Sequence, residues 1–167
     1  MVISARTAPK SGGVDDIYTA IVCGKEIEDL ARDMEKISAE RNIEAWRQQA
    51  KNVWDAEAIV LIGVKGTKNY ITNCGACGFS SCEMFQKAEK KRGQDFDGPN
   101  CIFKIMDLGI AVGSAVKTAG NLNVDNRIFY RIGVSAMRLN YVPEASVLLG
   151  IPLSVKGKNP YFDRVIK

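Results

Sequence analysis

The sequence predicts a single α+β or α/β domain with a small central sheet covered by helices. Short runs of β-branched and aromatic residues alternate with longer segments in which apolar residues recur every three or four positions. Of the 167 residues, 46% are hydrophobic and 25% are charged, which is ordinary for a folded domain of this length. No repeat or low-complexity segment interrupts this pattern, so we expect residues 1–167 to form one domain.

The first half of the chain predicts two strands separated by two helices. After a loop at residues 9–13, the β-branched run at 17–23 is typical of a strand. Apolar residues at helical spacing then predict one helix over 25–41 and a second over 45–54. The continuous apolar run at 58–64 suits a strand that is buried on both faces.

The middle of the chain predicts a short helix followed by a long one. Residues 83–92 have the composition of a short helix that ends at a glycine. A longer helix is expected over 101–119, with Cys101 on its first turn. Gly109 and Gly113 lie one turn apart on this helix, and we expect a neighbouring backbone to pack closely against them.

The last part of the chain predicts one more helix and one more strand. Asp125 is a plausible N-terminal cap for a helix whose inner face is formed by apolar residues within 128–139. Residues 146–151 predict a buried strand, and Pro152 indicates that pairing ends or changes there. We expect residues 154–167 to be irregular.

Charge and hydropathy argue against two classes of partner. The formal charge of +4 and the pI near 8.8 come from scattered lysines and arginines, so we expect no nucleic-acid partner. The longest apolar stretch, at 102–116, is interrupted by Lys104 and Asp107 and is too short and too charged to span a bilayer, so we expect no membrane association. The N-terminus does not resemble a signal peptide, which favours a cytoplasmic location.

Histidine is absent from the chain. This excludes serine–histidine triads, histidine-ligated zinc and acid–base chemistry by imidazole. No pair of carboxylates indicates an acid and a base either, so the sequence identifies no catalytic residue. The chemistry must be sought among the cysteines.

Four of the five cysteines occur in the order C-x2-C-x4-C-x18-C, three of them within NCGACGFSSC. Thiolate is the soft ligand that iron–sulfur clusters and zinc prefer, and Gly75 and Gly78 allow the chain to turn tightly between the ligands. An iron–sulfur cluster is the interpretation we favour; structural zinc, plain thiols and disulfides are the alternatives. The fifth cysteine, Cys23, ends an apolar strand and is expected to be a small buried hydrophobe. The four candidate ligands are Cys74, Cys77, Cys82 and Cys101.

The segment NCGACGFSSCEMFQKAEKKRG with a later PNC is similar to the small four-cysteine [4Fe-4S] module of bacterial membrane electron-transport complexes and corrinoid iron–sulfur proteins. This resemblance implies that residues 73–101 form an inserted cluster-binding segment with the four cysteines as ligands. Longer stretches, among them ARTAPKSGGVD, DLGIAVGSAVKTAG and VDNRIFYRIGVSAMRL, resemble an uncharacterised family of ferredoxin-domain-containing proteins. That family name implies a cofactor and no particular reaction.

The order of elements around ARTAPKSGG is also similar to that of the flavin-dependent nitroreductases. This resemblance implies a nitroreductase-like architecture, FMN as a second cofactor, and Arg6, Lys10 and Ser11 as residues that approach the flavin. It also implies that Lys156 or Lys158 approaches the flavin phosphate. Because nitroreductases build their flavin site between subunits, the resemblance further implies a homodimer in which the helix from Cys101 forms the interface.

The sequence thus predicts an iron–sulfur protein that acts in electron transfer or as a small oxidoreductase domain. The alternatives are a non-catalytic interaction module stapled by an iron–sulfur cluster or zinc, and a redox sensor. A redox partner protein is expected, and a basic group after the third cysteine could steer an acidic partner towards the cluster, although a solvated helix face would carry the same charges. That group comprises Lys87, Lys90, Lys91 and Arg92.

Overall fold

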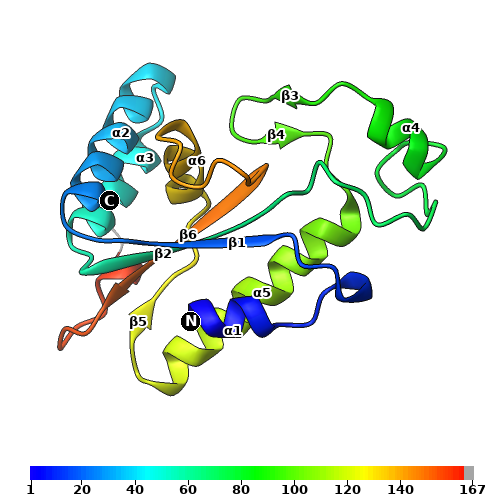
Figure 1. Ribbon diagram of the computed structural model, residues 1–167. Helices are drawn as coiled ribbons and strands as arrows, with labels where there is room; N and C mark the ends of the chain where they lie inside the picture. The colour runs from blue at the N-terminus through cyan, green and yellow to red at the C-terminus, as the bar shows by residue number, and fades with distance from the viewer. Residues whose placement is uncertain (164–167) are drawn as a thin grey trace.

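In the computed structural model, which describes residues 1–163, a four-stranded antiparallel sheet has the strand order β1-β2-β6-β5 (Figure 1). The two longest pairings join β2 to its neighbours. Val64 of β2 lies opposite Ile17 of β1 on one side and opposite Val147 of β6 on the other. The fold class predicted from the sequence is confirmed, because helices cover both faces of this small sheet. The strands are β1 (Ile17–Val22), β2 (Ala58–Val64), β5 (Asp125–Asn126) and β6 (Val147–Ser154).

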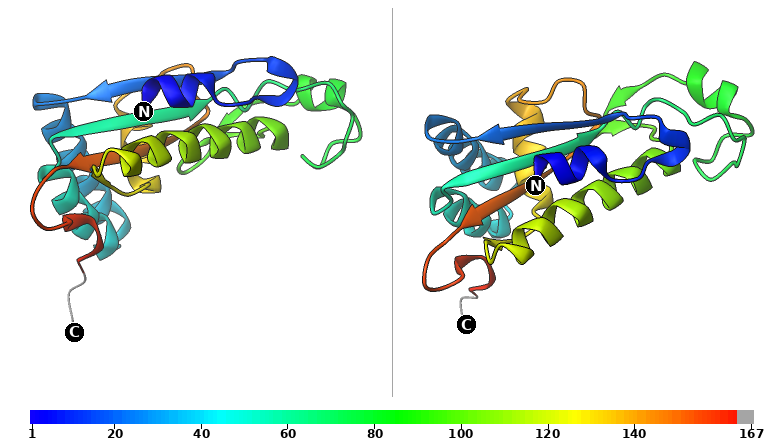
Figure 2. Two further views of the ribbon diagram at one scale, coloured as in Figure 1. Left: turned by 90° about the horizontal axis from the view of Figure 1, so that it is seen from below. Right: turned by 60° about the horizontal axis from the view of Figure 1, so that its bottom comes forward.

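Five helices form two layers around the sheet, as the two views of Figure 2 show. One layer contains α1 (Val2–Thr7) and α5 (Ile102–Asn121). The other contains α2 (Lys25–Arg41), α3 (Glu44–Trp54) and α6 (Tyr130–Arg138). The helices predicted over 25–41 and 45–54 therefore form as expected.

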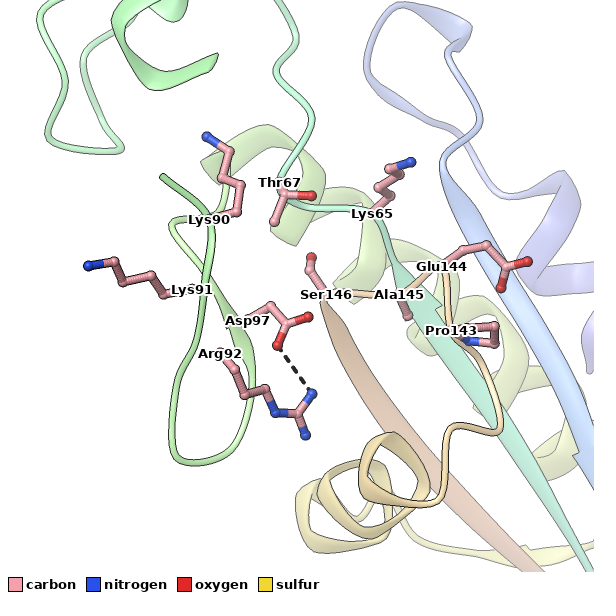
Figure 3. A pocket seen from close by; sticks show the side chains of 10 residues that line it. All are labelled: Lys65, Thr67, Lys90, Lys91, Arg92, Asp97, Pro143, Glu144, Ala145 and Ser146. Carbon is pink, nitrogen blue, oxygen red and sulfur yellow. Dashed lines mark hydrogen bonds and ion pairs between the residues drawn. The ribbon is translucent and has the colours of Figure 1, made fainter. Parts of the chain in front are cut away.

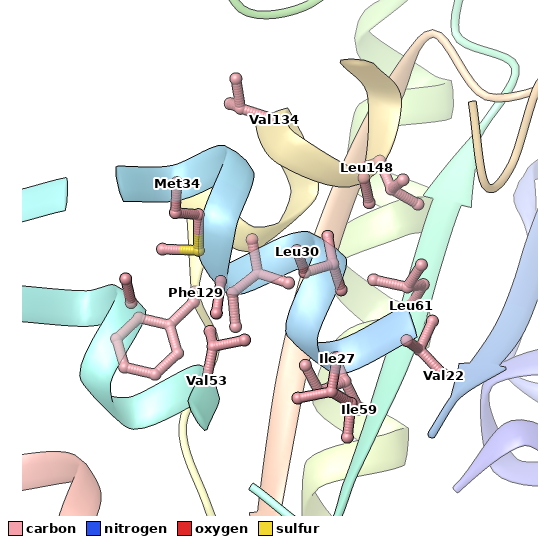
Figure 4. Packing of buried hydrophobic residues seen from close by; sticks show 14 of the residues in the cluster. Val22, Ile27, Leu30, Met34, Val53, Ile59, Leu61, Phe129, Val134 and Leu148 are labelled. Carbon is pink, nitrogen blue, oxygen red and sulfur yellow. The ribbon is translucent and has the colours of Figure 1, made fainter. Parts of the chain in front are cut away.

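Strand β2 supplies both hydrophobic cores because successive side chains of a strand point to opposite faces. Ile59 and Leu61 join the core under α2, α3 and α6, which Figure 4 shows, whereas Val60 and Ile62 join the core under α1 and α5. The strand is buried along almost its whole length, as the continuous apolar run predicts. This double burial makes β2 the central strand of the fold.

Helix α6 packs against β6 through two glycines. A Cβ on Gly133 would lie 1.7 Å from the Leu148 carbonyl oxygen, and a Cβ on Gly150 would lie 2.1 Å from the Ile132 side chain. Side chains at these two positions would therefore push the helix away from the strand. Their absence lets α6 lie directly on the sheet.

The prediction that Asp125 caps a helix is wrong. Asp125 and Asn126 form β5 and pair with Ser154 and Leu153 of β6, and α6 begins only after Phe129. The backbone of Phe129 also exchanges two hydrogen bonds with Gly150 of β6. Hydrogen-bonding groups along β6 thus gain partners, and this outweighs the local capping preference.

The prediction that strand pairing ends or changes at Pro152 is also wrong for β2, because β6 continues to Ser154 and Pro152 lies opposite Ile59. Gly150 directs its N–H and C=O towards Phe129, so the nitrogen of Pro152, two residues later, faces the same side of the strand. There the pairing with β5 is interrupted between Asn126 and Phe129. The N–H that proline lacks is therefore not needed by the ladder.

The helix predicted over 83–92 is shorter in the structure. Helix α4 (Cys82–Lys87) ends at an extended Ala88, and the next residues form the hairpin of β3 (Lys91–Arg92) and β4 (Asp97–Gly98). The Lys90 ammonium donates to the Phe85 carbonyl and so satisfies one group at the end of α4. At the hairpin tip, a 2.6 Å ion pair between Arg41 and Asp95 holds the turn against α2.

The segment after β6 is irregular apart from a 3-10 turn, η2 (Pro160–Phe162), as the sequence predicts for the part that the structure describes. The rest of that prediction, residues 164–167, lies outside the described residues. Among the helices within residues 1–163, none has both the length and the apolar character needed to cross a membrane.

A buried ion cluster joins α5 to the segment before β1. The Lys104 ammonium, which is fully buried, lies 2.8 Å from the Asp16 carboxylate and 3.9 Å from that of Asp107. Asp107 in turn accepts hydrogen bonds from the backbone N–H and the hydroxyl of Ser11, at 2.9 and 2.8 Å. Lys68, which follows β2, pairs with the other oxygen of Asp16 at 2.9 Å.

The ion cluster predicts a loss of stability in acid. Burial opposes ionisation of Asp16, but hydrogen bonds from Lys104 and Lys68 outweigh it and hold the pKa of the carboxyl below its usual value. A lowered pKa in the folded state gives stability that is present above the unfolded pKa, near 4, and is lost as the pH falls through the folded pKa.

Asp16→Asn should therefore lower the free energy of unfolding at pH 7 by about 3 kcal/mol, because Lys104 stays buried without its closest counter-ion. Urea denaturation would measure the change. Glu28→Gln is the control, since it removes an exposed ion pair with Arg32 and should change the free energy by less than about 0.5 kcal/mol. Equal effects of the two substitutions would contradict the assigned role of Asp16.

Candidate metal centre

The four candidate cysteines belong to a segment that leaves the sheet at the end of β2 and returns at the start of α5. This segment, residues 65–101, contributes no strand to the four-stranded sheet within the described residues and extends beyond one end of it, as Figures 1 and 2 show. We call it the insert. It carries α4 and the β3–β4 hairpin, and all four cysteines of the motif lie within it.

The two ends of the insert are held together at what we call the neck, formed by Gly66, Asn100, Cys101 and Ser146. The Cys101 N–H donates to the Gly66 carbonyl at 2.7 Å, and the Gly66 N–H donates to the Ser146 hydroxyl at 2.7 Å. Ser146 lies 2.7 Å from the side-chain oxygen of Asn100, whose amide nitrogen donates to the Asp97 carbonyl at 2.6 Å. The neck thus places Cys101 beside the start of the insert.

Gly66 is required at the neck by its close contact with Asn100. A Cβ on Gly66 would lie 2.4 Å from the Asn100 side-chain oxygen, so even alanine would displace Asn100. Ser146 is almost completely buried, and its hydroxyl accepts one hydrogen bond and can donate to either Asn100 or the Val64 carbonyl. Gly66, Cys101 and Ser146 are buried and Asn100 is half-buried, and the hydrogen bonds among them make the neck rigid.

The cysteine loop turns back on itself through backbone angles that glycine favours. Gly75 and Gly78 have φ of 72° and 85°, and the Gly78 N–H donates to the Gly75 carbonyl at 2.9 Å. Asn73 also has a positive φ, 51°, which asparagine tolerates better than most residues. The prediction that these two glycines let the loop turn is confirmed.

Backbone amides of this loop point towards sulfur. The Asn73 N–H donates to the Cys82 sulfur at 3.3 Å, while the Cys82 N–H donates to the Asn73 side-chain oxygen at 2.7 Å. The Ala76 N–H and the Thr72 hydroxyl hold the pKa of the exposed Cys74 thiol below its usual value. Donors that stabilise thiolate in this way also stabilise a thiolate that binds iron or zinc.

The four cysteines differ in exposure. Cys74 is exposed, Cys77 and Cys82 are half-buried, and Cys101 is buried at the neck; none of them is in a disulfide. Within residues 1–163, no three cysteine, aspartate or glutamate side chains are gathered closely enough to hold one metal ion. In a four-iron cluster each thiolate binds a different iron, so its ligands stand farther apart than those of a single ion.

The surroundings of the loop are aromatic and cationic. The Phe79 and Phe85 rings meet edge to face at 5.6 Å, and the Lys90 ammonium lies 4.0 Å from the Phe85 ring centre. Burial lowers the pKa of Lys90, while the charge of nearby Cys77 acts in the opposite direction. The other cations of the predicted basic group have acidic partners: Lys87 with Glu83, Lys91 with Glu89 and Arg92 with Asp97.

Two predictions about residues outside the insert fail. Cys23 is exposed rather than buried, because it follows the last residue of β1. The glycines of α5 do not meet a neighbouring backbone, since a Cβ on Gly109 or Gly113 would have nothing within 4 Å in the described residues. That surface of α5 is open in a single chain.

The residues that the nitroreductase resemblance assigns to a flavin loop lie together before β1, but their polar groups already have partners. Arg6 pairs with Asp15 at 2.7 Å, and the Lys10 ammonium donates to carbonyls at the end of α1. Ser11 donates to Asp107 through both its N–H and its hydroxyl. In the conformation described, all three make polar contacts within their own chain, and their contact with a flavin stays a prediction.

The two predicted phosphate ligands lie far from this loop within one chain. Lys156 and Lys158 follow the end of β6, whereas Ser11 precedes the start of β1. Because Ile17 and Val147 both lie opposite Val64, β1 and β6 start at the same end of the sheet. The lysines therefore lie at the opposite end, where Lys158 pairs with Asp163.

The flavin-loop segment is adjacent to the insert. A Cβ on Gly12, which has a φ of 60°, would lie 2.5 Å from the Tyr70 ring, and Tyr70 also packs on Phe103 of α5 at 5.2 Å between ring centres. The Lys68–Asp16 ion pair makes a second contact between the same two segments. The two regions that the sequence links to cofactors are thus neighbours in space.

Sequence reasoning missed the neck and the ion cluster. Lys104 and Asp107 were visible as charges within an apolar helix, which is a signal of a buried ion pair. No comparable signal marks Gly66, Asn100 or Ser146, because their partners lie 35 to 80 residues away in the chain.

Comparison with known proteins gives a family and a fold. A family model described as "Uncharacterized protein containing a ferredoxin domain (DUF2148)" matches residues 97–164. A protein of Archaeoglobus fulgidus, itself described as an uncharacterized protein, is 50% identical over 167 residues, which cover 100% of this chain and 89% of that protein.

Several similar solved structures are described as nitroreductases. Those with bound FMN from Desulfitobacterium hafniense and Bacteroides fragilis have TM-scores of 0.61 and 0.58 at 12% and 13% identity. The match covers 98% and 99% of this chain, and 79% and 84% of those chains. Nitroreductase A of Vibrio parahaemolyticus has a TM-score of 0.55 at 12% identity, over 95% of this chain but only 57% of its own length. At such identities the likeness establishes the fold alone.

Ser146→Ala should loosen the neck. Removing the buried hydroxyl leaves the Gly66 N–H without its partner, which should lower the free energy of unfolding by about 1–3 kcal/mol. Hydrogen exchange followed by mass spectrometry should show that, relative to wild type, the substitution accelerates exchange in residues 65–101 more than in α2. Ser80→Ala, at an exposed serine of the same insert, should change neither quantity, and unchanged exchange in Ser146→Ala would contradict the role of the neck.

Proposed function

The chain belongs to the family of proteins that contain a ferredoxin domain, and from this premise we propose that it binds one [4Fe-4S] cluster and acts in electron transfer or as a small oxidoreductase domain. Cys74, Cys77, Cys82 and Cys101 would be the ligands. The family and the nitroreductase-like fold support a redox role in general terms. The cluster and its ligands are our more specific proposal.

The observation that carries this proposal is the cysteine loop itself. Three unpaired cysteines lie on a glycine-containing loop whose amides point at sulfur, and the fourth is held at the neck beside the start of the same segment. Such donors favour the thiolate form that a metal centre requires. A disulfide-bonded scaffold would need paired cysteines, and the structure pairs none of the five.

Each part of the insert has a defined task in this proposal. When bound, an all-thiolate [4Fe-4S] cluster exchanges single electrons at low potential. The Asn73 N–H would continue to donate to the Cys82 sulfur, and the Phe79 and Phe85 rings would limit access of water from one side. Lys90 would place a positive charge near Cys77 and so partly offset the negative charge of the centre.

Cluster binding should be coupled to the conformation of the loop. The hydrogen bonds that close the neck use backbone and hydroxyl groups and no cysteine sulfur, so they leave the Cys101 sulfur available for a cluster. Cys74 is exposed on the loop, so it could move towards a cluster without displacing packed neighbours. Metal binding should therefore order residues 73–82 more than the rest of the insert.

A redox partner protein is the electron donor or acceptor that we propose. Since three of the four cations after the third cysteine are paired with carboxylates, long-range steering by this group should be weak. The partner should instead meet the exposed end of the loop, where Cys74 and Met84 are accessible. Contact there would bring the two redox centres close together.

FMN is a second candidate cofactor, favoured by the contact between the segment around Gly12 and the insert. Two of the similar structures contain FMN. Arg6, Lys10 and Ser11 are, however, engaged with residues of their own chain, so we derive no step that involves a flavin. Flavin contacts by these three residues stay a prediction.

We also propose that two copies of the chain associate through α5. Ile102, Met106 and Ile110 are exposed at four-residue intervals, and the open positions at Gly109 and Gly113 lie among them. This stripe is free of charge and would allow two helices to approach closely. A two-fold axis would let the same stripe serve both copies, which is the common arrangement in homodimers.

Cys82→Ser should abolish the visible absorption of anaerobically purified protein and lower its iron and sulfide content, because one ligand is lost. Far-UV circular dichroism would verify that the sheet and helices still form. Cys23→Ser is the matched control, since this exposed cysteine lies outside the insert and should not alter iron content. Colourless wild-type protein with stoichiometric zinc would refute the cluster and support the zinc alternative.

Ile110→Glu should convert a dimer into a monomer, because it places a charge in the middle of the exposed stripe. Light scattering after size-exclusion chromatography would measure the mass of each species. Ile21→Glu is the control, as Ile21 is exposed on β1 and does not belong to the stripe on α5. A wild-type protein that is monomeric at high concentration would refute the α5 interface.

A further inference from the structure

A cavity of about 430 Å³ opens between the β3–β4 hairpin and the neighbouring ends of β2 and β6 (Figure 3). Its walls come from three parts of the chain: Lys65 and Thr67 after β2, the hairpin, and the turn that leads into Ser146. The volume lies within the range of small-molecule sites in proteins. The cavity is distinct from the four cysteines, none of which lines it.

The walls are predominantly positive. They contain four cations, Lys65, Lys90, Lys91 and Arg92, and two carboxylates, Asp97 and Glu144. Arg92 pairs with Asp97 and Lys91 with Glu89, so the excess positive charge of the cavity comes from Lys65 and Lys90, and this excess favours anions.

The carboxylates do not neutralise the side of the cavity that Lys65 occupies. Asp97 is engaged by Arg92 at 3.1 Å, as the dashed line in Figure 3 shows. The Glu144 carboxylate points away from the hairpin. Within residues 1–163, the Lys65 ammonium makes neither an ion pair nor a hydrogen bond. Its charge is therefore available to a ligand.

The floor of the cavity is polar but already satisfied. The Ser146 hydroxyl is bonded within the neck to Gly66 and Asn100, so it does not compete for a ligand and it holds the floor rigid. The Thr67 side chain lies between Lys90 and Lys65 at the mouth of the cavity, and its hydroxyl can donate. The Lys90 ammonium donates to the Phe85 carbonyl and lies over the Phe85 ring, so Lys65 and Thr67 are the donors that remain for a ligand.

We propose that this cavity binds a small organic anion through a carboxylate or phosphate group, which Lys65 and Thr67 hold while Lys90 adds positive charge from the hairpin wall. Ammonium and hydroxyl donors form charge-assisted hydrogen bonds with such oxygens. The proposal adds a substrate class to the proposed redox function. The role of the anion as a substrate rests on that function, whereas its binding does not. Lys90 lines the cavity and closely follows α4, which begins at Cys82, so such a substrate would lie beside the cysteine segment.

Isothermal titration calorimetry on the full chain would test this, with inorganic phosphate in one arm and succinate in the other, at low ionic strength. We expect saturable binding in at least one arm, and the arm that binds identifies the group as phosphate or carboxylate. Lys65→Gln should weaken that binding about fivefold or more, the effect of losing one partly solvated ion pair. Thr67→Val should weaken it as well, because the hydroxyl donor is lost.

Lys117→Gln is the matched control, since Lys117 is an exposed lysine on α5 and its loss should leave binding unchanged. No saturable binding in either arm, unchanged binding in Lys65→Gln, or an equal loss in Lys117→Gln would each overturn the proposal.

Cys82→Ser, titrated in parallel, separates this proposal from the cluster assignment. Binding that persists in protein without iron supports the cavity independently of the cluster. Wild-type protein that binds the anion but contains no iron or sulfide would refute the cluster and leave the cavity standing.

Discussion

The hydrogen bond from the Cys101 N–H to the Gly66 carbonyl is the constraint on which the rest of the molecule depends. It brings the end of the central strand to the start of the longest helix, although 35 residues separate them in the chain. Helix α5 can therefore lie along the face of the sheet that β2 supplies with Val60 and Ile62. The same bond keeps the fourth cysteine beside the segment that carries the other three. Fold and candidate site thus depend on one junction, which Ser146 supports from β6.

Buried charge specifies how the N-terminal segment meets this junction. Alanines form much of the buried apolar face of α5, so hydrophobic packing alone specifies its position along the sheet weakly. The Lys104 ammonium has to reach the Asp16 carboxylate, and this requirement removes that freedom. Buried ion pairs often contribute little net stability, but they specify one arrangement among several that pack equally well. Here the specified arrangement places Gly12 under the Tyr70 ring, so the insert and the segment before β1 form one continuous surface.

Sequence patterns predicted those features of the structure that depend on residues close together in the chain. Helix α2 was predicted with its observed bounds because a glycine precedes it and its apolar face is regular. The cysteines were found because ligand spacing is a local property. The errors at Asp125 and Pro152 have a different origin, because both depend on pairing between residues distant in sequence. Asp125 joins β6 instead of capping a helix, and Pro152 stays in β6 because its nitrogen faces the side where pairing with β5 is interrupted. The neck could not be predicted for the same reason, since nothing near Gly66 shows that Asn100 and Ser146 will meet it.

The insert leaves and rejoins the rest of the domain at two residues that are hydrogen-bonded to each other. The domain therefore does not depend on the insert to span any distance. Since the entropy of closing a loop grows only with the logarithm of its length, the sheet is nearly indifferent to whether the excursion is short or long. Substitutions and length changes in the excursion can accumulate while the scaffold keeps its sequence. The junction at Gly66 and Cys101 therefore lets the length of the segment vary at little entropic cost to the closure of the scaffold.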